Sequence, residues 1–172
     1  MLLVALSLPL AACGEGREDN AVEAMERNAF ELGGLRYRVA MFRQLNPRIA
    51  PDRALYDGRL EGRVGLFAAF LIACNESGEP RRPTAAVQLE DAFGEVYPRV
   101  ARLDDNPLLY SPEPIQPGRC LPVRDGTADR TLPGAAVLFE VPFDALGNRP
   151  FVLELRDSES GPAAVERVQL DL

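Results

Sequence analysis

Three cysteines, Cys13, Cys74 and Cys120, carry the most specific chemistry in this 172-residue chain. Cys13 follows residues 1–12, which are uncharged, and every charged residue of the chain lies after it. The uncharged segment is apolar and ends in two alanines, as a secretory signal does before its cleavage site. It is too short to cross a bilayer, which needs about 20 residues. We therefore interpret residues 1–12 as a signal peptide and Cys13 as a processing boundary.

The four residues that end at Cys13 read Leu-Ala-Ala-Cys, and this order resembles the lipobox of bacterial lipoproteins. In that family the cysteine receives a diacylglyceryl group on its sulfur and becomes the N-terminus of the mature protein. The resemblance implies lipidation of Cys13 and a place on the extracytoplasmic face of a bacterial cell membrane. No basic residue precedes Cys13, unlike in the family, and a start codon upstream of Met1 accounts for this difference. A buried N-terminal strand that contains a cysteine is the alternative.

Cys74 and Cys120 remain once Cys13 is assigned to lipid. An even remainder in an exported domain favours a disulfide, because thiols outside the cytosol meet oxidising conditions. The alternative is two separate thiols, with Cys74 buried and Cys120 exposed, since spacing alone does not show that the Cβ atoms meet.

Asp104, Asp105 and Asn106 place two carboxylates and an amide side by side, and oxygen ligands of this kind suit calcium. The segment lacks the ligand spacing of a twelve-residue calcium loop, and a solvated turn is the other interpretation. A small-ligand or divalent-ion carrier of the cell envelope is therefore the alternative function that the sequence leaves open.

Other candidates for catalysis lack the partners that catalysis needs. The acidic pairs Glu90-Asp91 and 157–159 would serve as acid and base only if burial separated their pKa values. The serines that could act as nucleophiles are Ser77, Ser111, Ser158 and Ser160. The chain contains neither histidine nor lysine to activate them. We therefore expect a protein that is not an enzyme and that carries no cofactor and no metal ion.

The charge of the chain restricts its partners. The formal net charge is −7, and all 19 basic residues are arginines. Binding to nucleic acid requires clustered cations that displace counterions from phosphates, so we expect no nucleic-acid partner. The same charge argues against general adsorption to anionic lipid.

The elements that must position these residues read as short strands separated by proline and glycine. Residues 13–28 are rich in charge and glycine and predict a lipidated N-terminus with a flexible tether, and residues 29–172 predict one domain. Residues 35–45 alternate apolar and polar side chains, which is typical of a strand with one solvated face. The apolar run 63–74 predicts a central strand buried on both faces. A hairpin over 84–100 bends at residues 91–94, and further strands are expected at 135–142, 149–155 and 163–172.

Strands at this spacing, without a long amphipathic helix, predict an all-β fold, an antiparallel β-sandwich of about seven to eight strands. The order of segments resembles the telokin-like, immunoglobulin-like family of unknown function found on Gram-positive lipoproteins and secreted proteins. The segments that carry the resemblance are FLIACNESGEPRRPT (70–84), VQLEDAFGEVYP (87–98) and LPGAAVLFEVP (132–142). The resemblance implies an immunoglobulin-like sandwich and a membrane-surface or extracellular location. The extra stretch 46–62 departs from the family pattern.

The proline-rich segment 106–118 cannot form a regular ladder, yet it contains Leu108, Leu109, Tyr110 and Ile115. These apolar side chains are candidates for contact with a partner, because tyrosine in particular is frequent at interfaces. The alternative is that they fold back and cap one end of the sandwich. We expect a membrane-anchored lipoprotein whose domain binds or scaffolds an envelope or extracellular protein.

Overall fold

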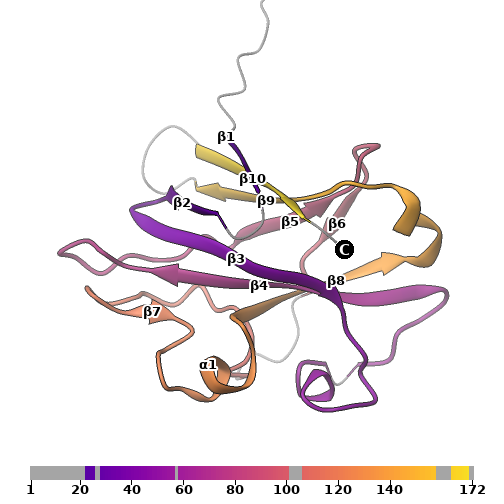
Figure 1. Cartoon of the computed structure of the whole chain (residues 1–172), viewed down its shortest axis with the longest axis horizontal. Helices are drawn as coiled ribbons and strands as arrows, with labels where there is room; N and C mark the ends of the chain where they lie inside the picture. The colour runs from indigo at the N-terminus through magenta and orange to yellow at the C-terminus, as the bar shows by residue number, and fades with distance from the viewer. Residues whose placement is uncertain (1–21, 26–27, 57, 101–105, 158–163, 171–172) are drawn as a thin grey trace, which may run out of the picture.

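The computed structural model describes residues 22–25, 28–56, 58–100, 106–157 and 164–170. Within these residues two β-sheets pack face to face, with their strands along the long axis of the molecule (Figure 1). Sheet A has the strand order β1-β10-β9-β5-β6, and sheet B has the order β2-β3-β4-β7, with β8 also paired to β4. Every pairing between these strands is antiparallel except that of β1 with β10, so the predicted antiparallel β-sandwich is confirmed.

The described residues contain ten strands and three short helices, more strands than the seven or eight expected. The strands are β1 (Val22–Met25), β2 (Ala29–Leu32), β3 (Leu35–Gln44), β4 (Val64–Cys74), β5 (Ala86–Glu90), β6 (Val96–Pro98), β7 (Cys120–Leu121), β8 (Ala135–Pro142), β9 (Phe151–Asp157) and β10 (Ala164–Leu170). The helices are η1 (Asp52–Ala54), α1 (Thr127–Thr131) and η2 (Phe143–Gly147). In this part of the chain no helix is both long and apolar enough to span a membrane.

Strand β4 is the centre of sheet B, as its apolar sequence predicts. It pairs with β3, β7 and β8, and seven consecutive residues from Gly65 to Leu71 are buried. Side chains on its inner face, such as Phe67, pack between the sheets against Phe42 at a ring distance of 5.8 Å. Burial on both faces requires a second apolar cover on the outside of the sheet.

That second cover comes from segments that lack regular strands. Leu55, Tyr56 and Leu132 are buried and pack in one cluster with Phe70 of β4 and Leu138 of β8. Leu55 and Tyr56 follow η1 within the stretch 46–62, and Leu132 follows α1. The stretch 46–62 therefore contributes to a second core on the outer face of sheet B.

The two ends of the sandwich differ. We call one the disulfide end, where β3 begins beside Cys74, and the other the hairpin end, where the β5–β6 turn lies against the segment after η2 through a bond from the Ala92 amide to the Asn148 carbonyl (3.0 Å). The ten residues of β3 separate these ends by roughly 30 Å. In Figure 1 the disulfide end is on the left and the hairpin end on the right.

Strand β1 occupies Val22–Met25, within the residues 13–28 that the sequence predicted as a lipidated N-terminus and flexible tether. Val22–Met25 pairs in parallel with β10, beginning at Glu166 in the half of sheet A nearer the disulfide end. Without β1, strand β10 would be an edge with unpaired backbone groups, and such an edge accepts any extended segment within reach. The residues 13–21 that precede β1 lie outside the described part, and the tether expected there stays a prediction.

Candidate functional site

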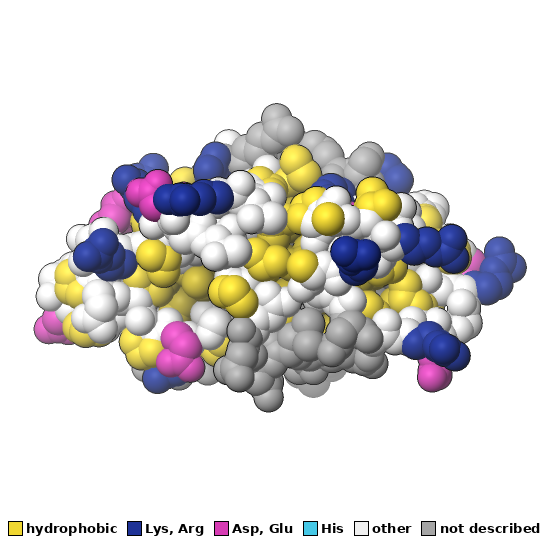
Figure 2. All heavy atoms as spheres, turned by 90° about the horizontal axis from the view of Figure 1, so that it is seen from below, with side chains coloured by type: hydrophobic (Ala, Val, Ile, Leu, Met, Phe, Trp, Pro, Cys, Tyr) yellow, Lys and Arg dark blue, Asp and Glu magenta, His cyan; other side chains and the backbone are white. Residues whose placement is uncertain are grey.

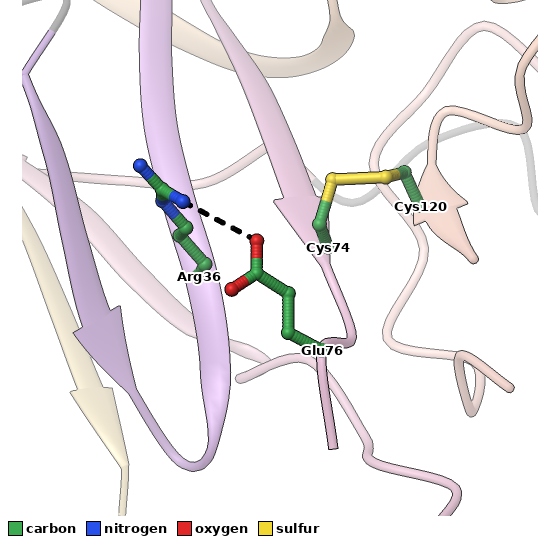
Figure 3. Close-up of a disulfide and its surroundings, with 4 residues drawn as sticks. All are labelled: Arg36, Cys74, Glu76 and Cys120. Carbon is green, nitrogen blue, oxygen red and sulfur yellow. Dashed lines mark hydrogen bonds and ion pairs between the residues drawn. A yellow bond between two sulfur atoms is a disulfide. The ribbon is translucent and has the colours of Figure 1, made fainter. Parts of the chain in front are cut away.

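The predicted bridge between Cys74 and Cys120 is present in the structure. The sulfur atoms are 2.08 Å apart and the Cα atoms 4.0 Å apart, across a sequence separation of 46 residues. The two cysteines face each other in the pairing of β4 with β7, beside the ion pair of Arg36 and Glu76 (Figure 3). Cys13 lies outside the described residues.

A hollow of about 340 Å³ surrounds this disulfide, and we call it the arginine hollow. Its lining comprises Ala29, Arg36, Tyr37, Arg38, Ile72, Cys74, Glu76, Cys120, Pro122, Arg124 and Asp129. Arg36 and Arg38 come from β3, whereas Arg124 follows β7. Three guanidinium groups and two carboxylates therefore meet over a partly apolar surface.

A larger hollow of about 680 Å³ lies at the hairpin end, between the last residues of β3, the segment after it and the start of β4. Arg43 donates two hydrogen bonds to the carboxylate of Asp52, at 2.8 and 2.6 Å. The hydrogen bonds from Arg43 lower the pKa of Asp52, although burial opposes this. The guanidinium of Arg43 also lies 5.3 Å from the ring centre of Phe70. The pair is thus fixed as one wall of this hollow.

Apolar side chains are exposed mainly at the hairpin end. Six large apolar side chains of the described residues are exposed, and four of them belong to this end. These four, which we call the apolar rim, are Ile49 (56% exposed), Phe93 (82%), Val96 (41%) and Phe143 (42%). Ile49 and Phe143 also line the larger hollow.

The face of the molecule that carries α1 and η1 bears both apolar and charged side chains. Figure 2 shows a band of apolar side chains across the middle of this face, with arginines around it. Met41, on the outer face of β3, is 36% exposed and Val123, beyond β7, is 64% exposed. Single exposed side chains of this kind are common in soluble proteins, so the concentration at the hairpin end is the more informative feature.

The hairpin turn that carries Phe93 is held by a buried carboxylate. Asp91 is 3% exposed and accepts hydrogen bonds from the amides of Phe93 (2.9 Å) and Glu95 (3.0 Å), the hydroxyl of Tyr97 (3.0 Å) and the side-chain amide of Asn148 (2.8 Å). Burial alone would raise the pKa of Asp91, but these four donors together lower it. Asp91 is therefore an ionised anchor of the turn.

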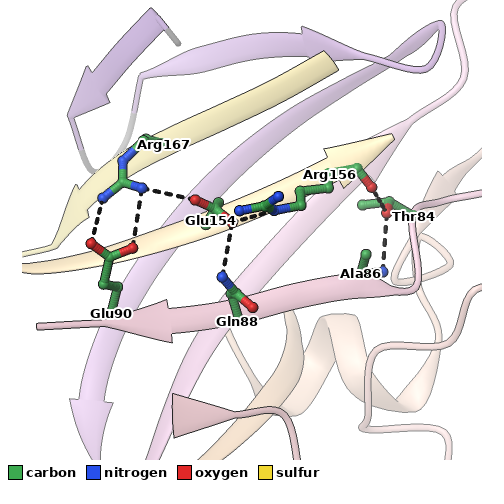
Figure 4. Close-up of polar contacts among 7 residues, drawn as sticks. All are labelled: Thr84, Ala86, Gln88, Glu90, Glu154, Arg156 and Arg167. Carbon is green, nitrogen blue, oxygen red and sulfur yellow. Dashed lines mark hydrogen bonds and ion pairs between the residues drawn. The ribbon is translucent and has the colours of Figure 1, made fainter. Parts of the chain in front are cut away.

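Glu90, the neighbour of Asp91 in the sequence, belongs to a different network, on the outer face of sheet A (Figure 4). Arg167 donates to both oxygens of Glu90 (3.1 and 3.0 Å) and to Glu154 (2.8 Å). Glu154, although only 2% exposed, also accepts hydrogen bonds from Gln88 and Arg156. The network joins β5, β9 and β10, so Glu90 and Asp91 do not form the coupled acid–base pair considered from the sequence.

The proline-rich segment folds back onto the sandwich. Leu108, Tyr110 and Ile115 are at most 6% exposed, and Leu109 is partly buried against the outer core. The hydroxyl of Tyr110 donates to the carbonyl of Thr84 at 2.9 Å. These four residues consequently pack within the domain, and Leu108 and Tyr110 bond to the backbone of Ala136 in β8. The segment thus folds back as the alternative expected, but it lies beside β8, and the expected exposed contact for a partner is not seen there.

The remaining sequence candidates divide into structural residues and residues outside the described part. Asp104, Asp105, Ser158 and Ser160 lie outside it. Asn106 donates to the carbonyl of Ala54 at 2.7 Å, whereas the hydroxyl of Ser77 donates to the side chain of Asn75 at 2.7 Å. The described ranges contain no group of three or more histidine, cysteine or acidic residues that could hold a metal ion.

Comparison with known proteins extends to the fold alone. No protein-family model matches the chain, and no curated protein matches its sequence. Among solved structures, the chain is similar to an uncharacterized β-sandwich protein from Clostridium difficile 630, with a TM-score of 0.52 and 10% sequence identity. The alignment covers 92% of this chain and 99% of that chain. A similarity at this level of identity shows a shared β-sandwich architecture.

Proposed function

We propose that this chain is a lipid-anchored protein of the extracytoplasmic face of a bacterial cell membrane, and that its non-enzymatic β-sandwich binds or scaffolds another envelope or extracellular protein. In this proposal Cys13 carries the lipid, residues 14–21 link it to β1, and the apolar rim is the docking surface. Membership of the telokin-like, immunoglobulin-like family is part of the same proposal.

The pairing of the cysteines is the observation that carries the proposal. A disulfide between Cys74 and Cys120 is typical of proteins that fold in an oxidising compartment. It leaves Cys13 as the remaining cysteine, directly after Leu-Ala-Ala and at the change from apolar to charged sequence. Two or more acyl chains hold a protein stably on a membrane, so such an anchor accounts for an exported domain without a membrane-spanning helix in its described part.

The exposure of aromatic side chains at the hairpin end supports a docking role for the apolar rim. Phe93 is 82% exposed and Phe143 is 42% exposed. Aromatic side chains, phenylalanine among them, are enriched at protein–protein interfaces.

The anchor is tested by Cys13→Ser in the full chain, expressed in a bacterium that processes lipoproteins. We expect the variant to move almost entirely from the membrane fraction to the soluble envelope fraction, because the serine oxygen does not accept the lipid. Circular dichroism of the released domain should match that of the wild type. Ser7→Ala, which changes the same segment but keeps Leu-Ala-Ala-Cys, should remain with the membrane. Retention of the Cys13→Ser variant at wild-type levels would contradict the anchor.

The docking surface is tested by photo-cross-linking in intact cells, with a photoreactive phenylalanine analogue at position 93 or 123. Both side chains are exposed, but only Phe93 belongs to the apolar rim. We expect a discrete adduct from position 93, reduced on the order of tenfold by adding Ile49→Ser and Phe143→Ser, since a loss of about 1.4 kcal/mol in binding corresponds to that factor. Position 123 serves as the matched control. Identical adducts from both positions would exclude the apolar rim as the specific surface.

A further inference from the structure

The arginine hollow lies at the disulfide end, away from the apolar rim, and two of its arginines have no partner among the described residues. We propose that it binds a phosphate group, carried either by a small soluble molecule or by a lipid headgroup. This inference rests on the geometry of the hollow and does not depend on the docking role of the apolar rim.

Among the described residues, some charged side chains of the hollow have a hydrogen-bond or ion-pair partner and others have none. The guanidinium of Arg36 lies 3.3 Å from the carboxylate of Glu76, and Asp129 accepts a hydrogen bond from the amide of Asp125 at 2.9 Å. Arg38 and Arg124 have no hydrogen-bond or ion-pair partner in the described ranges of the chain. Within the described residues, two guanidinium groups without a partner therefore border the same 340 Å³ hollow.

The backbone around these two arginines is firmly placed. Arg38 is on β3, where its partners in the neighbouring strands are Ala29 and Ile72. Arg124 follows Cys120 by four residues, and the disulfide ties that segment to β4. The turn that contains Arg124 is closed by the bond from the Gly126 amide to the Val123 carbonyl at 3.0 Å. The bridge thus sets the position of Arg124 relative to Arg38, which a binding site requires.

The chemistry of two guanidinium groups favours a phosphate. Each guanidinium presents a planar fork of donors that matches two oxygens of a phosphate, and a phosphate has enough oxygens for two such forks. The surrounding Ile72, Pro122 and disulfide give an apolar surface for the rest of the ligand. Because the chain as a whole carries a net charge of −7, an anion would bind at this local site rather than over the general surface.

The first test is a titration of the full chain carrying Cys13→Ser, in its oxidised form, with inorganic phosphate, followed by NMR of the amides and arginine side chains. We expect saturable shifts at Arg38, Arg124 and the residues between Cys120 and Asp125. Arg38→Ala and Arg124→Ala should each weaken binding on the order of tenfold, as expected for loss of one charge-assisted bidentate contact. The double variant should abolish binding.

Matched variants separate the site from general charge effects. Arg53→Ala, at an exposed arginine of η1, removes the same charge at the hairpin end and should leave phosphate binding unchanged. The variant with both Arg38→Lys and Arg124→Lys keeps the charge but loses the planar forks, and it should bind more weakly than the wild type. Reduction of the disulfide should also weaken binding, because it frees the segment that carries Arg124.

The two sources of phosphate are separated by vesicle binding. The same oxidised protein is mixed with vesicles of phosphatidylcholine, with and without phosphatidylglycerol, and pelleted. Vesicle binding that is lost in the Arg38→Ala, Arg124→Ala variant assigns the hollow to a lipid headgroup. Saturable binding of inorganic phosphate without such vesicle binding assigns it to a soluble phosphate. Absence of both, or equal binding by the wild type and this double variant, overturns the proposal.

Discussion

Replacement of both Cys74 and Cys120 by alanine is expected to lower the free energy of unfolding by about 4 kcal/mol. The bridge joins residues 46 apart, and such a cross-link removes conformational freedom from the unfolded chain in proportion to the logarithm of the loop length. Domains of ordinary size are stable by only about 5–15 kcal/mol, so the loss is a large share of the total. Urea unfolding of the variant and of the wild type, with and without reductant, measures it.

The matched control is Cys13→Ala, which removes a cysteine that has no part in this bridge. Its urea midpoint should equal that of the wild type, and reductant should lower the midpoint of this control as it does for the wild type. The variant without Cys74 and Cys120 should show no response to reductant. If the free energy of unfolding of that variant differs from that of the wild type by less than about 1 kcal/mol, as for an ordinary surface substitution, a structural role for the bridge is contradicted.

The parts of the fold that the sequence predicted well are those determined by neighbouring residues. The alternation in 35–45 became β3, and the apolar run 63–74 became the central strand β4. The turn at 91–94 was also correct, with Gly94 at a φ of +82° and its amide bonded to the carbonyl of Asp91. Periodicity and turn chemistry act over a few residues, and no knowledge of distant partners is needed to read them.

The parts that were missed depend on contacts between distant segments. Strand β1 pairs with β10, which lies more than 130 residues later in the sequence. The composition of β1 and its neighbours is that of a flexible tether. Leu55 and Tyr56 belong to a core, but they follow a single 3-10 turn without a recognisable period. Glu154 sits among three strands whose register brings Arg167 and Gln88 to it, and register cannot be read from one strand alone.

The candidate sites follow the same division. Assigning Cys13 to lipid left Cys74 and Cys120 as the pair that the sequence favoured, but only the structure decides between a bridge and two separate thiols. The arginine hollow was missed because Arg38 and Arg124 are brought together only by the pairing of β3 with β4 and of β4 with β7. The apolar rim was missed because exposure of Phe93 and Phe143 depends on where turns lie in the folded molecule.

The second large effect is expected for Asp91→Ala, which should cost about 3 kcal/mol in the free energy of unfolding. The substitution leaves two backbone amides, the Tyr97 hydroxyl and the Asn148 side chain without their acceptor. Each unpaired buried donor costs about 1–3 kcal/mol, and water entering at the turn recovers part of that. Glu113→Ala, at an exposed acidic residue of the proline-rich segment, is the control and should not change stability.

Asp91 also predicts the direction of the pH dependence. Its pKa in the folded domain is lowered below the ordinary value of 3.8, so ionised Asp91 stabilises the fold above that pH. This contribution is lost as the pH falls below about 4, through the folded-state pKa, because the protonated carboxyl no longer serves as an anionic acceptor. The stability of Asp91→Ala should fall less steeply than that of the wild type over the same range, in urea unfolding at successive pH values. An identical slope in both proteins would assign the acid sensitivity to other carboxylates.

Asp91→Asn distinguishes the charge of this anchor from its shape. The amide oxygen still accepts from the amides of Phe93 and Glu95, but its nitrogen would face the donor of Asn148. We therefore expect a loss of stability between those of the wild type and Asp91→Ala, without the acid dependence. Because the bond to the Phe93 amide remains, the turn should keep Phe93 in place, and cross-linking from position 93 should persist in Asp91→Asn but fall in the folded fraction of Asp91→Ala. Equal cross-linking in the two variants would show that rigid presentation of Phe93 is not needed for docking.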